Sequence, residues 1–416
     1  MKHVLVIGGG ASGLMAAIFA ARSGADVTLV EQNEKLGKKI YITGKGRCNL
    51  TNDADRDTFL AEVARNPRFL YSALDFFGPR DMMALLEDTG CPVVVQRGRR
   101  VFPASEKASD VTRALEKLLL REGVHVLLNT RVTALVSAAS RVTGAKLSSG
   151  LELQADAVVL ATGGLSYPST GSTGDGYRWA ESLGLTVTPP SPVLTGLETV
   201  EDWPCQLQGL SLRNVALALR SGGKTLYSDL GELLFTHYGV SGPLVLTASC
   251  HLPGTGKPAM LQLDLKPGLS MEQLDARLLR ELSAGARKQL SHMLPVLLPA
   301  RMAAIFPGLC GIPSTLPCNQ VTAQQRIRLA EALKNLAMTV RSPRPVTEAV
   351  VTRGGVSVSE VNPGTMACRN ISGLYLAGEM IDVDAHTGGY NLQIAWATGA
   401  LAGTHAALDP VQTESK

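Results

Sequence analysis

The sequence predicts an α/β fold in which a parallel sheet is built from both ends of the chain and is interrupted by two insertions. Three observations predict this arrangement. Residues 1–32 run from an apolar segment through a Gly-rich turn and an Ala-rich segment into a second apolar segment, as in a βαβ unit. After Pro189 the pattern changes to short alternating segments, and residues 266–336 show helical periodicity. From residue 346 the chain returns to apolar runs that end in glycine.

These changes in sequence pattern predict three domains. Both ends of the chain, residues 1–190 and 346–416, form a discontinuous nucleotide-binding domain. An antiparallel β domain takes residues 191–265 and 337–345, and a helical domain takes residues 266–336. Within the first domain we expect a helix over 108–122 capped by Ser109 or Asp110, strands at 124–128 and 132–136, a hairpin around Gly150, and a buried strand that ends at Gly163.

Composition indicates a globular enzyme. The chain has 416 residues, of which 45% are hydrophobic and 18% are charged, so it is long enough for two or three domains. Its 7 cysteines lack CxxC pairs and zinc spacing, which is typical of reduced thiols and predicts no metal site. Neither a signal-peptide pattern nor an apolar run of about 18 residues is present, so we expect a cytoplasmic protein without membrane segments.

Charge is unevenly distributed. The net charge is only +4, but residues 261–345 hold 11 Lys/Arg and 5 Asp/Glu. A solvated helical surface is the ordinary explanation of such a segment, and contact with RNA phosphates is the alternative.

A dinucleotide-binding motif lies at the first turn. Gly8, Gly10 and Gly13 form GxGxxG directly after a strand and at the start of a helix, the context that the motif requires. The glycines let the backbone approach a pyrophosphate, and the helix N-terminus supplies N–H groups and partial positive charge. Glu31 ends the second strand, where its carboxylate accepts hydrogen bonds from a ribose diol and disfavours the 2′-phosphate of NADP.

Later motifs favour FAD over NAD in this site. ATGG at 161–164 and the Gly378–Glu379 pair both follow buried strands, at the carboxyl edge of the sheet where ligands bind. An FAD molecule that extends across the domain needs such a late strand. Thr387 and Gly388 then open an Ala-rich helix whose N-terminus stabilises negative charge on a reduced flavin.

Seven segments, in the same order along nearly the whole chain, resemble the YhiN/BaiN-like flavoproteins, also described as aminoacetone-oxidase-type FAD-dependent NAD(P)H oxidoreductases. They are GGGASGLMAA with Glu31, GKKIYITGKGRCNLTN, GRRVFPASEKASDV, ATGGLSYPSTGSTGDGY, GELLFTHYGVSGP, VTRGGVSVSEVNPGTM and GLYLAGEMIDVDAHTGGYNLQIAWATG. The resemblance implies bound FAD and a glutathione-reductase-type FAD-binding Rossmann domain with inserted β-barrel and helical modules.

The resemblance also implies a cofactor-binding set. It places Gly8, Gly10, Ser12 and Gly13 on the pyrophosphate, Glu31 on the ribose, Val132 on the adenine, Gly163 beside the dinucleotide, Gly378 and Glu379 along the ribityl phosphate, and Gly389, Tyr390, Asn391 and Leu392 at the flavin ring. The adjoining residues complete the set: Ala11, Gln32, Arg47, Cys48, Asn49, Ala161, Thr162 and Gly388.

Proton transfer beside a flavin calls for Cys, His or Tyr, so Cys48, His237 and His386 are the catalytic candidates. A structural hydrogen bond is the alternative for either histidine, and packing or a flavin contact is the alternative for Cys48. The segment around Cys48, TGKGRCNLTN, lacks the spacing of a P-loop and is interpreted as a turn along FAD.

The reaction class follows in outline. No second GxGxxG is present, so NADH or NADPH would bind transiently at the flavin, or the substrate itself would be the reductant. We expect hydride transfer through flavin N5 and a reductase of C=C or C=N bonds in a small organic substrate. Activities linked to the family give two alternatives, an rRNA uridine reductase that forms dihydrouridine and an aminoacetone-type amine oxidase that uses oxygen.

Overall fold

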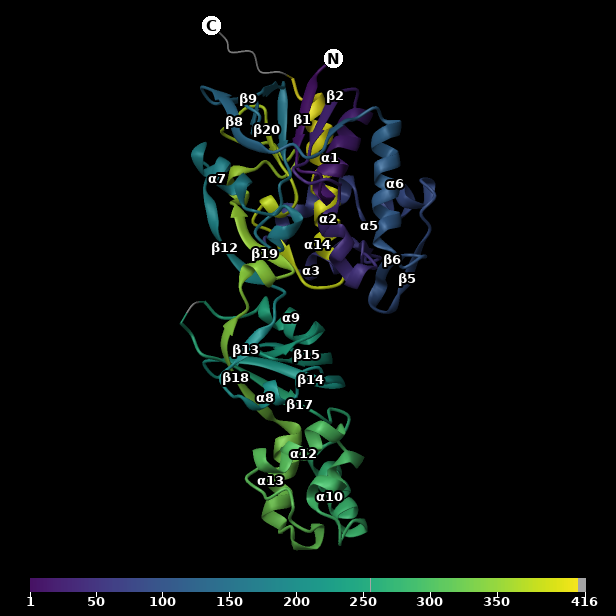
Figure 1. Cartoon of the computed structure of the whole chain (residues 1–416), viewed down its shortest axis with the longest axis vertical. Helices are drawn as coiled ribbons and strands as arrows, with labels where there is room; N and C mark the ends of the chain where they lie inside the picture. Colours follow the sequence, from purple (N-terminus) through teal and green to yellow (C-terminus); the bar gives the residue numbers. More distant parts are fainter. Residues whose placement is uncertain (255, 411–416) are drawn as a thin grey trace. The chain divides into compact units, whose positions relative to one another are not determined.

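The structure is a computed structural model that describes residues 1–254 and 256–410. Contacts divide the chain into two compact units, the first made of Met1–Val193 with the segment from Pro345 onward, and the second of Leu194–Arg344 (Figure 1). The last residues of the expected FAD-binding domain, 411–416, lie outside the described residues. None of the described helices is long and apolar enough to cross a membrane.

The first unit is built on a parallel five-stranded sheet, as the sequence predicted. Its order is β20 (Leu374–Leu376), β11 (Ala157–Leu160), β1 (His3–Ile7), β2 (Asp26–Val30) and β7 (His125–Leu127). The central strand β1 is buried from Val4 to Ile7, because apolar β-branched residues fit a sheet covered on both faces. The two ends of the chain therefore meet in one sheet, which confirms the predicted α/β class.

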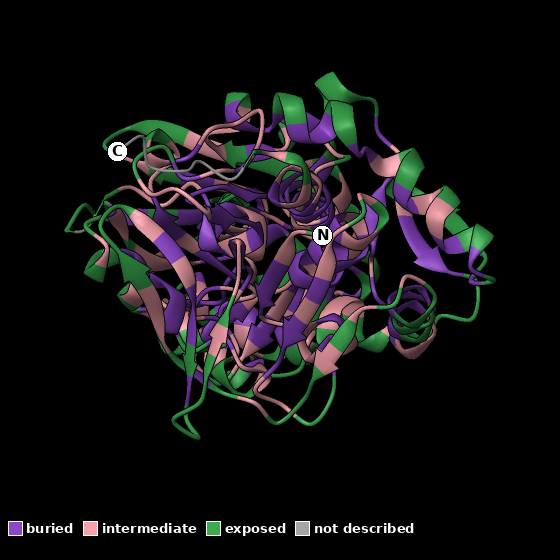
Figure 2. Cartoon of the chain, turned by 90° about the horizontal axis from the view of Figure 1, so that it is seen from above, coloured by how far each residue is buried: buried purple, intermediate pink, exposed green. Residues whose placement is uncertain are grey.

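Helix α1 (Ala11–Arg22) packs on the C-terminal helix α14 (Tyr390–Leu408). Gly399 and Gly403 make this close approach possible, since a Cβ at either position would overlap the backbone of Ser12 or Ala16. The start of α1 is thereby fixed beside the helix that follows the last strand. Figure 2 shows the buried residues of this interior in purple.

Smaller sheets surround this layer. The hairpin predicted around Gly150 is present, as β9 (Arg141–Leu147) pairs antiparallel with β10 (Glu152–Gln154) and with β8 (Val132–Ala138). The remaining elements are α2 (Lys38–Ile42), β3 (Thr51–Asn52), α3 (Arg56–Ala61), β4 (Val63–Arg65), α4 (Tyr71–Phe76), α5 (Pro79–Asp88), β5 (Val93–Gln96), β6 (Arg100–Pro103), α6 (Ala108–Arg121), α7 (Asp175–Ser182), β12 (Val187–Val193), β19 (Val351–Val356) and β21 (Asp384–Ala385).

The predicted cap of α6 was wrong. Its N-cap is Lys107, and Ser109 and Asp110 lie inside the first turn. A carboxylate there interacts with the helix dipole without closing the helix as a cap.

The second unit contains the β-barrel that the family resemblance implied. Six strands close in the order β13 (Leu197–Thr199), β16 (Gly239–Ser241), β15 (Lys224–Thr236), β14 (Ser211–Ser221), β17 (Ala259–Asp264) and β18 (Leu336–Pro343). The short helices α8 (Trp203–Gln206) and α9 (Pro243–Ser249) accompany the strands.

Residues 266–336 are mainly helical and hold α10 (Met271–Ala284), α11 (Leu290–Met293), α12 (Ala300–Leu309) and α13 (Ala323–Lys334). Capping boxes at Ser270 and Thr322 start α10 and α13. Their apolar side chains join those of the barrel in one hydrophobic core. The division into a barrel domain and a separate helical domain therefore stays a prediction.

Candidate cofactor-binding and active site

The turn between β1 and α1 uses each motif glycine differently. Gly8 has φ +105°, and a Cβ there would lie 2.5 Å from the Ala161 carbonyl oxygen. A Cβ at Gly13 would overlap the carbonyl oxygen of Gly8, whereas nothing lies within 4 Å of a Cβ at Gly10. Gly10 is also the N-cap of α1 and provides no side-chain hydrogen bond. The space beside Gly10 at the helix N-terminus is therefore open, as an anion-binding site requires.

Glu31 stands beside this turn. Its Oε2 accepts a hydrogen bond from the Gly9 N–H at 2.7 Å, and its Oε1 accepts from the Asn33 N–H at 2.8 Å and the Asn33 Nδ2 at 2.6 Å. The next residue, Gln32, donates to the Gly171 carbonyl oxygen at 2.8 Å. A carboxylate offers about four acceptor positions, so the fixed Glu31 group keeps capacity for a ribose hydroxyl.

The two strand ends approach α1 through glycines and small side chains. Gly378 has φ +70°, and a Cβ there would lie 2.5 Å from Ser12 Oγ. Gly163 has φ +73°, and its Cβ would lie 2.8 Å from Ser172 Oγ. The expected residues between or beside them are buried or half-buried, namely Ala11, Val132, Ala161 and Thr162. Six positions of the expected cofactor-binding set thus lie at the start of α1 or at the ends of the adjoining strands, namely Ala11, Ser12, Ala161, Thr162, Gly163 and Gly378, whereas Val132 lies at the start of β8.

Glu379 forms the centre of a charged cluster. Lys39 Nζ donates to its Oε2 at 2.7 Å, while Ser166 Oγ and the Thr352 N–H donate to its Oε1 at 2.9 and 2.6 Å. Burial acts to raise the pKa of Glu379, but the Lys39 ammonium and these hydrogen bonds outweigh it and lower the pKa below the usual value. Glu379 is therefore ionised and held in place at the sheet edge.

Replacing Lys39 by Met is expected to destabilise the protein by about 2 kcal/mol at neutral pH, less than a fully buried pair because both side chains keep some exposure. The lowered pKa of Glu379 gives stability that is present above its unfolded pKa and is lost as pH falls through the folded pKa. In Lys39→Met, burial acts unopposed by the ammonium, so the loss should be largest at neutral pH. Urea unfolding of both proteins from neutral to acidic pH measures this difference.

The matched control is Lys38→Met, because Lys38 pairs with Glu34, whose side chain is 60% exposed. Its stability should follow that of the unaltered protein at every pH. A Lys39→Met deficit that stays constant as pH falls would contradict the charge account of Glu379.

Residues 43–52 form a turn with an unusual backbone. Gly44, Lys45, Gly46 and Cys48 all have positive φ. Arg47 turns away from Cys48, donating to Glu106 Oε1 at 3.0 Å and lying 4.4 Å above the Phe102 ring. The adjacency of Arg47 and Cys48 in sequence therefore does not activate the thiol.

Asn49 lies on the other side of this turn. With its amide oxygen turned toward α14, Asn49 accepts from the Gly389 N–H at 3.0 Å and donates to the Thr51 carbonyl oxygen at 3.2 Å. This contact places the turn against the start of α14, where the flavin ring was expected.

Cys48 is fully buried in the protein interior. Burial raises the pKa of its thiol to about 12, against a lesser opposing effect of the hydrogen bond from Thr43. The thiol is therefore neutral at physiological pH, and this favours the packing interpretation over thiolate chemistry.

Cys48→Ala is expected to keep FAD and to change turnover less than about twofold, with a loss of about 1 kcal/mol in stability typical of a core substitution. In the native protein, iodoacetamide should label the half-exposed Cys205 and leave Cys48 unmodified. Retained FAD with lost turnover in Cys48→Ala would instead identify Cys48 as a proton donor.

The chain enters α14 through two glycines with positive φ angles. Gly388 and Gly389 have φ +136° and +99°, and a Cβ at Gly389 would overlap the Thr51 carbonyl. The Asn391 side chain turns back, donating to the Ala385 carbonyl oxygen at 2.7 Å and accepting from the Ala385 N–H at 3.0 Å. Leu392 is half-buried on the next position. Asn391 thus fixes the loop that precedes the helix.

Tyr390 packs edge-on against Phe59, with ring centroids 5.0 Å apart. Burial and the Glu62 carboxylate raise the pKa of Tyr390 to about 12, against an opposing effect of the nearby guanidiniums of Arg100 and Arg99. Tyr390 is therefore a neutral phenol close to a basic turn.

His386 lies two residues before Gly388. Its Nδ1 is 3.0 Å from Glu62 Oε2, and its backbone N–H donates to the Glu62 carbonyl oxygen at 2.9 Å. The hydrogen bond from His386 lowers the pKa of Glu62. A carboxylate that holds one ring nitrogen orients the other, which is the arrangement of an acid–base histidine.

The other catalytic candidate, His237, belongs to the second unit. It lies between β15 and β16, and its ring meets that of Tyr238 edge-on at 4.9 Å. Its role at the flavin stays a prediction.

The sequence interpretation missed Asn52 and two ion pairs close to the start of α14. Arg353 binds both carboxylate oxygens of the fully buried Asp384, at 2.9 and 2.7 Å. Arg65 Nε lies 2.6 Å from Oδ1 of Asp382, which is also buried. Asn52 is 1% exposed, and its Oδ1 has no hydrogen-bond partner among the described residues. No local pattern marks the ion pairs, although Asn52 ends the quoted TGKGRCNLTN segment.

The residues at the start of α1 and beside the start of α14 fit FAD. The open helix N-terminus at Gly10 suits a pyrophosphate, the fixed Glu31 carboxylate suits a ribose, and the unpaired Asn52 oxygen at the start of α14 calls for a donor such as the flavin supplies.

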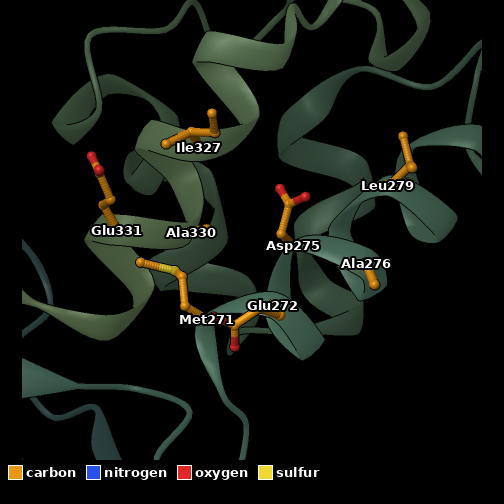
Figure 3. A pocket seen from close by; sticks show the side chains of 8 residues that line it. All are labelled: Met271, Glu272, Asp275, Ala276, Leu279, Ile327, Ala330 and Glu331. Atoms are coloured by element: carbon orange, nitrogen blue, oxygen red, sulfur yellow. The ribbon is translucent and has the colours of Figure 1, made fainter.

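The helical segment of the second unit is less suited to binding an anion than its excess of Lys and Arg indicated, because several of these side chains form ion pairs. Lys334, Arg326 and Arg280 are within 2.6, 2.7 and 3.4 Å of Asp264, Asp275 and Glu281. A groove of about 470 Å³ lies between α10 and α13. Figure 3 shows the side chains that line this groove, and the charged ones among them are acidic. Its lining comprises Met271, Glu272, Asp275, Ala276, Leu279, Ile327, Ala330 and Glu331.

Comparison with protein families finds a match of residues 2–405 to the HI0933-like protein Rossmann domain. The chain is 36% identical to a 3-dehydro-bile acid delta(4,6)-reductase of Clostridium scindens, over 99% of this chain and 100% of that one. It is 31% identical to a ribosomal RNA dihydrouridine synthase of Escherichia coli, over 95% of each.

A solved structure shares the fold. The 3-ketosteroid delta1-dehydrogenase of Sterolibacterium denitrificans aligns with a TM-score of 0.54 and 17% identity, over 98% of this chain and 100% of that one.

Proposed function

The chain belongs to the HI0933-like family and is an FAD oxidoreductase, and from this premise we propose that it reduces a carbon–carbon double bond conjugated to a carbonyl group, with NADH or NADPH as electron donor. The observation that carries the proposal is the similarity along the whole chain to a relative named as a reductase of this kind. The proposed substrate class is a small organic molecule.

The names of the two relatives describe one kind of chemistry. A delta(4,6)-reductase of a 3-dehydro-bile acid acts on double bonds in line with a 3-keto group. A dihydrouridine synthase saturates a uracil double bond that is conjugated to a carbonyl. In both substrates the carbonyl accepts developing negative charge as hydride adds to the far carbon, and a proton must reach the near carbon. For the substrate of this chain we propose the same chemistry, in which the carbonyl accepts negative charge and a protein group supplies the proton.

Bound FAD supplies hydride transfer at N5. The residues of the chain bind the cofactor and manage charge and protons. The α1 N-terminus at Gly10 and the carboxylates of Glu31 and Glu379 are proposed to hold the dinucleotide, and the α14 N-terminus to stabilise negative charge at the ring.

His386 is proposed to supply the proton. The Glu62 carboxylate lies 3.0 Å from its Nδ1 and orients the ring, and Nε2 is the atom proposed to carry the proton. His386→Gln should lower kcat about 100-fold, within the usual range for a general acid, with little change in KM.

Glu62→Gln should give a smaller loss of kcat, because Glu62 acts by orienting the His386 ring through the contact at Nδ1. His237→Gln is the parallel variant for the second candidate. If His386→Gln keeps its full kcat and pH profile, the proton comes from another group.

The electron donor and the electron-accepting substrate are identified in one experiment under anaerobic conditions. The purified oxidised holoprotein is mixed with NADH, NADPH or an aminoketone, and loss of the yellow flavin absorbance is followed. The reduced protein is then mixed with a ketone-conjugated alkene or with oxygen. Reduction by a nicotinamide and reoxidation by the alkene support the proposal. Reduction by the aminoketone alone would indicate the amine oxidase alternative.

A second candidate, reduction of uridine in rRNA, is favoured by one specific feature. The turn between β5 and β6 carries Arg97, Arg99 and Arg100, and Arg97 and Arg100 form no ion pair with described residues. Arg99 and Arg100 lie near Tyr390 at the start of α14. Phosphates of an RNA substrate would fit this turn better than the acidic groove of the helical segment.

The matched test is an Arg97→Ala/Arg100→Ala variant. If RNA is the substrate, its RNA affinity should fall and depend less steeply on salt, while turnover of a neutral small alkene is unchanged. Equal RNA binding by both proteins would exclude this turn as an RNA contact.

A further inference from the structure

Asn52 has a buried amide whose orientation is fixed. Its Nδ2 donates to two backbone carbonyl oxygens, that of Gly98 at 3.1 Å and that of Gly388 at 3.0 Å. Turning the amide over would set its oxygen against both carbonyls, so the nitrogen must face them. Its Oδ1 therefore points away from Gly98 and Gly388.

That oxygen has no partner. It is buried without a hydrogen bond among the described residues, and the residue is 1% exposed. Most buried polar atoms in proteins are hydrogen-bonded, and each exception calls for a specific explanation. In the unit that holds the cofactor-binding residues, Asn52 is the one described residue whose buried side chain leaves an oxygen unpaired.

Asn52 also lies where a flavin ring is expected. Gly388, its hydrogen-bond partner, precedes the N-cap of α14, and the backbone of Thr51 touches Gly389. Thr51 Oγ1 donates to Gln393 in the first turns of α14 at 2.7 Å. These contacts hold strand β3 along the start of α14. The unpaired Asn52 oxygen therefore lies beside the N-terminus of that helix.

We propose that Asn52 Oδ1 accepts a hydrogen bond from N3–H of the FAD pyrimidine ring. The oxidised isoalloxazine has a single N–H donor, at N3, between two carbonyl groups. With FAD bound, N–H groups at the start of α14 would donate to a carbonyl beside N3, and N3–H would then need an acceptor next to them. Asn52 supplies this acceptor, which orients the ring and discriminates flavin from rings that lack the donor. The inference rests on bound FAD and is independent of the substrate.

The experiment compares FAD with N3-methyl-FAD, which lacks the donor, on apoprotein of the unaltered chain and of Asn52→Ala. The unaltered protein should bind N3-methyl-FAD at least about 10-fold more weakly than FAD. Asn52→Ala should bind FAD about 10-fold more weakly than the unaltered protein and should not prefer it to N3-methyl-FAD. Asn370→Ala, at an exposed asparagine of the same unit, is the control and should keep the full preference.

A second readout follows the flavin itself. Ionisation of N3–H changes the absorbance of bound FAD, and its pKa should be lower in Asn52→Ala than in the unaltered protein, because the lost acceptor stabilised the protonated form. Thermal unfolding of the apoproteins separates a folding defect from lost recognition. The proposal is overturned if the unaltered protein binds both flavins equally, or if Asn52→Ala keeps the preference and the N3 pKa. Those results would leave FAD binding itself intact.

Discussion

Gly13→Ala is expected to yield a protein that does not retain FAD and that unfolds with at least about 2–3 kcal/mol less free energy than the unaltered chain. The added Cβ would overlap the carbonyl oxygen of Gly8, which is itself fixed by a positive φ and by contact with Ala161. Backbone on both sides cannot move aside as a side-chain rotamer can. The helix start must shift, and the N–H groups that are proposed to bind the pyrophosphate shift with it. FAD titration and urea unfolding of the apoprotein measure both effects.

Gly10→Ala separates the two effects. Nothing lies within 4 Å of its Cβ, so the apoprotein should unfold like the unaltered chain. The methyl group enters the space proposed for the pyrophosphate, and FAD affinity should fall about 10-fold or more. Gly268→Ala, at an exposed glycine of the second unit whose Cβ also meets nothing, is the control for both measurements. Tight FAD binding by Gly13→Ala would contradict the assignment of this turn.

Arg353→Met is expected to lower the free energy of unfolding by about 3–5 kcal/mol. The guanidinium makes two hydrogen bonds to Asp384, whose side chain is 0% exposed, so its loss leaves a buried carboxylate without its counter-ion. Because β21 leads into His386 and the start of α14, flavin affinity should fall with stability. Denaturant unfolding of apoprotein and holoprotein measures the two losses.

A double variant, Arg353→Met with Asp384→Leu, removes both charges and should recover part of this stability, since an apolar pair of similar volume replaces the ion pair. The exposed Arg56–Asp75 pair provides the control, and Arg56→Ala should leave the unfolding midpoint unchanged. A double variant less stable than Arg353→Met would show that Arg353 acts through other contacts.

The sequence predicts the parts of this site that depend on local pattern. The roles proposed for Gly8, Gly10 and Gly13 follow from a turn of six residues between a strand and a helix, and a Cβ at Gly8 or Gly13 would overlap neighbouring backbone. Family resemblance adds Glu379 and the start of α14. These positions need only the order of motifs along the chain.

Contacts between distant segments were not predictable in the same way. Lys39 meets Glu379, and Asn52 meets Gly388, across more than 300 residues of sequence. Nothing in the composition of either segment names its partner. The same limit explains Arg47 and Cys48, which are neighbours in sequence, although Arg47 contacts Glu106 and Phe102 while Cys48 is fully buried. Adjacency along the chain is weak evidence for side-chain contact.

The most direct test of the account is anaerobic reoxidation of the chemically reduced holoprotein by a ketone-conjugated alkene. We expect the yellow absorbance to return at a rate that saturates with alkene concentration, and one saturated ketone to form per flavin. Omitting NADH and NADPH makes the result independent of the electron donor. A flavin that stays reduced with conjugated alkenes and uridine-containing RNA, yet is reoxidised by oxygen, would contradict it.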